Sequence, residues 1–154
     1  MSAAHRQRGV AAVEFALVFV ILFSVVYALA TFGAVLYTQQ TVTRAAEEGA
    51  RAAGLITAPV TGDPRVKDAV YDSLAQSLVV PVSANTSVAT RRSWIVSNVD
   101  VTAAASGAGT GASFVVTVSY PYSANRLLPT MPLLDTSQWM PDRLLSRSTI
   151  AIRS

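Results

Sequence analysis

Hydrophobic residues are concentrated in one long block near the start of the chain. From Val10 to Leu36 the only charged residue is Glu14, and the next charge along the chain is Arg44. The hydrocarbon core of a bilayer is about 30 Å thick, so about 20 apolar residues span it as a helix rising 1.5 Å per residue. The block therefore predicts a single membrane-spanning helix.

The helix is expected to continue beyond the membrane. No proline interrupts the range from Val10 to Ala58, so we predict one helix that ends near Ile56 after an amphipathic segment. Small residues with a spacing of four form a ridge along that segment: Ala45, Gly49 and Ala53. Such a ridge is a possible site of helix packing. It can lie beneath the protein's own sheet or against another subunit of a filament.

The charges on this segment are arranged for pairing along the helix. Arg44 with Glu48, and Glu47 with Arg51, are spaced i,i+4, which favours ion pairs worth a few tenths of a kcal/mol. We predict that all four side chains lie on the solvated face.

A second helix is predicted after a break at residues 57–62. Asp63 followed by Pro64 is typical of an N-cap with proline in the first turn, and the helix is expected to reach about Val79. Its predicted core-facing residues are Val66, Ala69, Val70, Leu74 and Leu78. The next stretch, Pro81 to Arg92, is polar and rich in turn formers.

Three strands are predicted for the rest of the chain: Trp94 to Ala103, Ala112 to Tyr120 and Leu144 to Ile152. On the middle strand Phe114, Val116, Val118 and Tyr120 share one face. The predicted fold is α+β, with a long transmembrane helix continuing into a small head that holds a second helix and an antiparallel sheet of about three strands. The predicted divisions are a leader at 1–9, the long helix at 10–56 and the head at 57–154.

The N-terminus carries a family resemblance. The leader from Met1 to Gly9 is short and basic, and the string from Arg8 to Phe15 reads RGVAAVEF. It resembles the processing site of type IVb prepilins, which has a glycine, four residues, and then a glutamate followed by an aromatic residue. In that family a membrane-embedded peptidase cuts after the glycine on the cytoplasmic face. The resemblance implies a prepilin peptidase as a partner, Gly9 as the last leader residue and Val10 as the new N-terminus.

The same resemblance implies a role for Glu14 and Phe15 in subunit assembly. The α-amine exposed at Val10 would be a cation, with an ordinary pKa of about 8, one helical turn from the Glu14 carboxylate. In pilins this pairing is thought to join neighbouring subunits. The alternative for Glu14 is a carboxylate that extends to the lipid headgroups from near the end of the membrane helix.

Two further segments narrow the resemblance. Residues 44–54 look like the small-residue helix that follows the anchor in TadE-like proteins, and residues 114–122 are similar to that family's aromatic-proline strand end. The chain is therefore similar to TadE-like pseudopilins of the tight-adherence (Flp) pilus system. The resemblance implies a minor pilin that helps to initiate, prime or cap a type IVb filament used for adhesion. Its implied partners are other pilin-like subunits, the inner-membrane assembly platform and membrane lipid.

Charge predicts the orientation and argues against some functions. His5, Arg6 and Arg8 precede the anchor, which favours a cytoplasmic N-terminus and a periplasmic head at the bacterial inner membrane. The net charge of +3 is scattered, so nucleic acid is not an expected partner. The single histidine lies in the leader and there is no cysteine, so we expect no catalytic, metal or cofactor site.

One apolar, proline-rich stretch and two competing functions remain open. Residues 127–141 either cover the open side of the sheet or form a docking surface that includes Leu133, Leu134, Trp139 and Met140. The protein could instead be a permanently anchored envelope scaffold that never enters a filament. It could also be an exported soluble module, released by cleavage between Ala30 and Thr31, although the apolar stretch is longer than that of most secretory signals.

Overall fold

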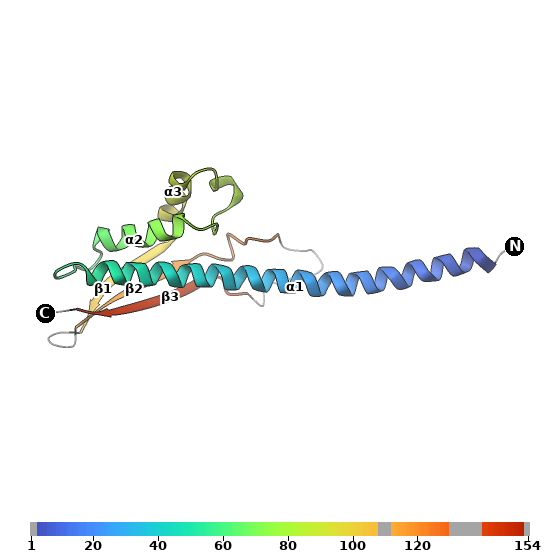
Figure 1. The fold of residues 1–154 in the computed structure, drawn as a ribbon, viewed down its shortest axis with the longest axis horizontal. Coiled ribbons are helices and arrows are strands. Elements are labelled where there is room, and N and C mark those ends of the chain that lie inside the picture. Colours follow the sequence, from blue (N-terminus) through green and yellow to red (C-terminus); the bar gives the residue numbers. More distant parts are fainter. Residues whose placement is uncertain (1–2, 108–111, 130–139, 153–154) are drawn as a thin grey trace. The chain divides into compact units, whose positions relative to one another are not determined.

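The computed structural model describes residues 3–107, 112–129 and 140–152, with the side chains described from Val10 onward. The elements are helix α1 (Ala3–Gly54), helix α2 (Pro64–Ala75), a 3-10 turn (Val82–Ala84), helix α3 (Val88–Asn98) and strands β1 (Asp100–Ser106), β2 (Ser113–Tyr120) and β3 (Leu144–Ala151). Figure 1 shows them along the chain. The predicted α+β class is confirmed, with its long first helix, its second helix and its three-stranded antiparallel sheet.

Helix α1 takes part in both compact units of the chain. The first unit ends at Val35 and the second begins at Leu36, so the last part of α1 belongs to the head. Within the described residues, Val10–Gly54 is the one helical stretch with the length and composition to cross a membrane. Its apolar part therefore has the properties of a membrane anchor.

Two hydroxyl side chains of the apolar stretch, Ser24 and Thr31, find hydrogen-bond partners within the helix. The hydroxyl of Ser24 donates to the carbonyl oxygen of Val20 at 2.8 Å, and that of Thr31 donates to the carbonyl oxygen of Tyr27 at 2.7 Å. A hydroxyl without a partner would be costly in hydrocarbon. These two bonds make Ser24 and Thr31 compatible with a membrane.

Helix α2 starts as predicted and ends earlier than predicted. The Asp63 side chain caps it and Pro64 is its first residue, while Val66, Val70 and Leu74 are fully buried. The helix stops at Ala75, where the backbone N–H and the hydroxyl of Ser77 both donate to the carbonyl oxygen of Leu74. Leu78 is therefore 57% exposed, and its predicted place in the core is wrong.

Asp63 makes the stability of the head dependent on pH. Its Oδ1 accepts from the backbone N–H and from Nε of Arg65 at 3.0 and 3.2 Å, and its Oδ2 accepts from Nη2 at 3.0 Å. The hydrogen bonds from the Arg65 side chain hold the pKa of Asp63 below its usual range, against the opposing effect of burial. The stabilisation is therefore present above the unfolded pKa of about 3.9 and is lost as the pH falls through the lower folded pKa.

We expect Asp63→Asn to lower the unfolding temperature of the full chain in detergent at pH 7 and to have less effect as the pH falls below 4. Asparagine still caps a helix but cannot form the ion pair. Thermal melts between pH 7 and pH 3 measure the difference between the two proteins. A difference that stays constant across this range would rule out the ion pair as its source.

Helix α3 replaces a predicted turn-rich stretch and the first part of a predicted strand. Ser87 caps it by accepting from the backbone N–H of Thr90 at 3.1 Å, and Ile95 is its buried residue. The predicted strand from Trp94 to Ala103 is therefore wrong over residues 94–98, where Val96 is 46% exposed on the helix. Strand β1 consequently begins at Asp100 and not at Trp94.

The sheet has the order β1-β2-β3, and both pairs are antiparallel. The four residues of β2 that were predicted to share one face are all fully inaccessible: Phe114, Val116, Val118 and Tyr120. The hydroxyl of Tyr120 donates to the carbonyl oxygen of Val79, and its ring lies 6.2 Å from that of Trp94. The predicted bounds of β2 and β3 agree with the structure to within one residue at each end.

Strand β3 has one open edge. Ile152 N–H donates to the carbonyl oxygen of Ala112 at 3.0 Å, so by alternation the backbone groups of Leu145, Arg147 and Thr149 point away from β2. Nε2 of Gln39 donates to the Leu145 carbonyl oxygen at 3.1 Å. Among the described residues, no backbone group bonds to this edge at Arg147 or Thr149.

Candidate functional site

Gly9 and Val10 lie inside helix α1, which begins at Ala3. A peptidase that cuts between them must open the first turns of the helix to reach the peptide bond. Glycine lowers the cost of that opening, because it destabilises a helix interior by about 1 kcal/mol relative to alanine. The Val10 side chain is 69% exposed. The glycine therefore lowers the cost of unwinding the helix at this bond.

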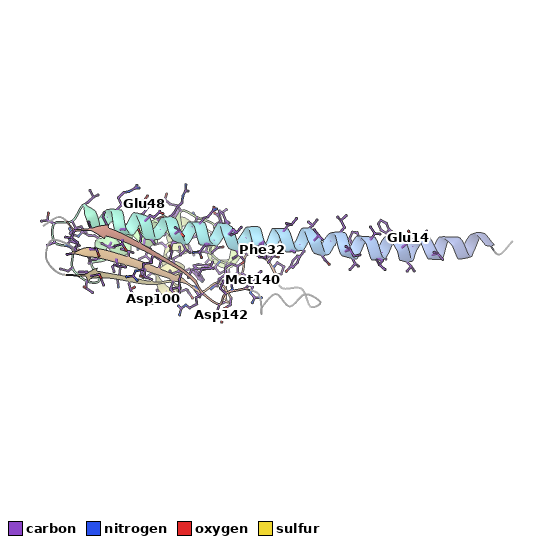
Figure 2. All side chains as sticks on the ribbon, turned by 90° about the horizontal axis from the view of Figure 1, so that it is seen from below. Glu14, Phe32, Glu48, Asp100, Met140 and Asp142 are labelled. Carbon is purple, nitrogen blue, oxygen red and sulfur yellow. The ribbon has the colours of Figure 1, made fainter. Side chains whose placement is uncertain are left out.

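Glu14 lies on the same side of α1 as Val10, one turn further along. Figure 2 shows its side chain projecting from the helix. Its side chain is exposed and has neither an ion pair nor a side-chain hydrogen bond within the described part of the chain. The site therefore consists of a carboxylate at the start of an apolar helix, and its charge is not compensated by any side chain described from Val10 onward.

An aromatic stripe follows Glu14 along the first unit, and sequence reading noted only its first member. Rings spaced four residues apart stack in sequence, with centroid distances of 6.1, 6.0 and 6.5 Å: Phe15, Phe19, Phe23 and Tyr27. The i,i+4 spacing was the available signal. Phe15, assigned to assembly by the family resemblance, is 70% exposed.

The small-residue ridge of α1 lies in the core of the head. Ala45 and Ala53 are buried, and a Cβ added at Gly49 would lie 2.5 Å from Cγ2 of Val70 and 3.1 Å from Cγ1 of Val116. The absent side chain is what lets α1 approach both α2 and β2 this closely. In this structure the ridge packs against the protein's own head, which was one of the two alternatives.

The charged face of the same segment borders an open groove of about 740 Å³ between α1 and α2. Its charged lining consists of Arg44, Glu47, Glu48, Arg51 and Asp72. The ion pair observed here joins Arg51 to Glu48 at 3.2 Å, with i,i+3 spacing. The predicted i,i+4 pairs do not form, and the observed pair is exposed enough to contribute little.

A second ion-pair cluster was missed by sequence reading. Nη2 of Arg92 lies 2.7 Å from Oδ1 of Asp68, and its Nε lies 2.6 Å from Oδ1 of Asp72. Hydrogen bonding to Asp72 is the main reason that the pKa of Arg92 is raised. The cluster joins α3 to α2. No signal in the sequence pairs residues twenty or more positions apart.

Only part of the predicted docking surface can be placed. Leu133, Leu134 and Trp139 lie outside the described residues. Met140 is half-buried, and the nearby Asp142 carbonyl oxygen accepts from the Ser123 N–H at 3.0 Å (Figure 2). Within the described residues, no group of three histidine, cysteine or acidic side chains could hold a metal ion.

Comparison with known proteins identifies one family. The family described as TadE-like protein matches residues 9–51, which include the Gly9–Val10 bond, Glu14 and two residues of the small-residue ridge, Ala45 and Gly49. No curated protein and no solved structure matches the chain. The TadE-like resemblance predicted from the sequence is confirmed for this segment.

Proposed function

We propose that this chain is a TadE-like minor pilin that takes part in initiating, priming or capping a type IVb Tad pilus. The family match indicates a pilin-like protein associated with the Tad pilus, and the apolar helix indicates a membrane anchor. The proposed chain is anchored in the bacterial inner membrane with its N-terminus in the cytoplasm and its head in the periplasm.

The observation that carries the proposal is the Glu14 carboxylate one helical turn after Val10, inside the segment that matches the family and without a partner among the described side chains. Cleavage after Gly9 creates an α-amine at Val10, and that cation neutralises a carboxylate in a poorly hydrated place. When the Val10 amine of one subunit pairs with Glu14 of another, this ion pair fixes the axial position of the incoming helix relative to its neighbour. The protein itself performs no chemistry in this scheme and is the substrate of a prepilin peptidase.

The test is the N-terminal residue of the protein purified from the membranes of its native host. We expect mass spectrometry to find Val10 at the N-terminus, and a Gly9→Leu variant to retain the whole leader, because a bulky side chain replaces the glycine before the cut. A Leu17→Ala variant, altered within the apolar helix beyond the cleavage string, is the matched control and should be cut normally.

Two outcomes would contradict the proposal. A wild-type protein that keeps its leader would favour a permanently anchored scaffold. A wild-type protein that starts at Thr31 would favour an exported soluble module and would end the pilin interpretation.

A further inference from the structure

One end of the second unit gathers the start of β3, the end of β2 and the first head residues of α1. Gln39 of α1 donates to the Leu145 carbonyl oxygen at 3.1 Å, and Leu144 pairs with Tyr120. The residues that leave β2 also stay at this end, since the Ser123 N–H donates to the Asp142 carbonyl oxygen. Figure 2 shows Asp142 and Met140 at this end of the sheet.

The position of Gln39 in the sequence of α1 places this end of the second unit close to the membrane. Counting about 20 residues of helix from Phe15 places the limit of the hydrocarbon near Ala34. Gln39 follows five residues later, which is about 7.5 Å along a helix axis. The headgroup layer on each side of a bilayer is about 5–8 Å thick. Gln39, and with it Leu145, therefore falls within the depth of the headgroups.

The side chains at this position have interfacial chemistry. Leu145 is 61% exposed although it is a large apolar residue at a strand start, and Arg147 lies on the same outward face two residues later. Arg143 directly precedes the strand and is exposed. Neither arginine forms an ion pair within the described part of the chain. On α1, Tyr37 is 44% exposed.

We propose that the segment from Arg143 to Arg147 rests in the headgroup layer of a bilayer that contains anionic phospholipid. Leu145 provides an apolar contact in this layer, and the arginines on either side of it bind lipid phosphates. Tyr37 adds an aromatic side chain of the kind enriched at membrane interfaces. These contacts hold the head on the membrane before any other subunit binds. The inference goes beyond the proposed function and needs only the membrane anchor.

The chain contains no cysteine, so single cysteines can be introduced for spin labelling. We would label Leu145→Cys, Thr149→Cys and Leu55→Cys in the full chain, reconstituted in vesicles of phosphatidylcholine alone or mixed with phosphatidylglycerol. Leu55 is the matched control, because it is 85% exposed and follows the other end of α1. Electron paramagnetic resonance measures the collision of each label with oxygen, which favours lipid, and with a water-soluble nickel chelate.

In vesicles with phosphatidylglycerol we expect the label at Leu145 to favour oxygen, the label at Leu55 to favour the nickel chelate, and Thr149 to lie between them. Adding Arg143→Ala or Arg147→Ala should each lower the equilibrium constant for binding of this segment to the membrane by about fivefold, and lysine at either position should restore it. Equal accessibility at Leu145 and Leu55, or no difference between the two lipid mixtures, would overturn the proposal. No peptidase or pilin is present, so this result is independent of the cleavage test.

Discussion

Replacing Glu14 with alanine is expected to remove the protein from sheared filaments while leaving it in the membrane. Glu14 is exposed and lacks a side-chain partner within the described residues, so its loss breaks no contact that stabilises the folded subunit. In the proposed assembly its charge matters only when the Val10 amine of a second subunit arrives. A charge-assisted hydrogen bond contributes about 1.5–3 kcal/mol, so incorporation should fall by about tenfold to a hundredfold.

The measurement is the amount of the protein in the filament fraction relative to the membrane fraction, by quantitative mass spectrometry. Glu47→Ala is the matched control, since Glu47 is also an exposed carboxylate on α1. Glu14→Gln should behave like Glu14→Ala if charge is what matters, and Glu14→Asp should recover part of the incorporation. Unchanged incorporation of Glu14→Ala would exclude the pairing and favour a carboxylate that extends to the headgroups.

Replacing Gly49 with leucine is expected to cause the largest loss of stability in the head. The first added carbon already meets Val70 Cγ2 at 2.5 Å, and Val70 is β-branched and fully buried. Such a side chain cannot turn aside, because its rotamers are restricted. Overpacking of this kind costs about 3 kcal/mol, which corresponds to a fall in unfolding temperature of about 10 °C.

Two other glycines of α1 provide controls for this change. A Cβ at Gly33 would meet nothing within 4 Å, so Gly33→Leu should leave the melt unchanged. A Cβ at Gly54 would meet Cδ1 of Ile150, the far end of a flexible side chain, so Gly54→Ala should cost less than Gly49→Ala. The fluorescence of Trp94, which packs on Tyr120, follows the melt of the head in detergent. An unchanged melt for Gly49→Leu would contradict the close packing of α1 on α2 and β2.

Short-range sequence patterns were sufficient to predict helix α1, the N-cap of α2 and strands β2 and β3. They failed where a distant contact decides the structure. Arg92 binds Asp68 and Asp72 of α2, and Nε of Arg91 donates to the carbonyl oxygen of Ala75, so tertiary contacts support a helix at residues 88–98, where a turn-rich stretch and the start of a strand were predicted. Leu78 was misassigned because the four-residue spacing of apolar side chains continues in the sequence beyond Ala75, where helix α2 ends.

The candidate site was predictable where it depends on residues that lie close together in the sequence. The spacing from Gly9 to Phe15 can be recognised without knowledge of the fold, and it lies in the segment that the family comparison also matches. The ridge around Gly49 left two alternatives open, because spacing alone does not say which surface lies opposite a small residue. Only the positions of Val70 and Val116 answered that question.

The open edge of β3 bears on how many copies of this protein can share a small area of membrane. Anchored chains are confined to two dimensions, where the exposed edge of one sheet meets the next at high local concentration, and bare edges join into aggregates. Here the Leu145 carbonyl oxygen already accepts a hydrogen bond from Gln39, and Arg147 places a positive charge in the middle of the edge. Two such edges placed side by side would bring like charges together, so the heads can crowd at a site of assembly and remain separate molecules.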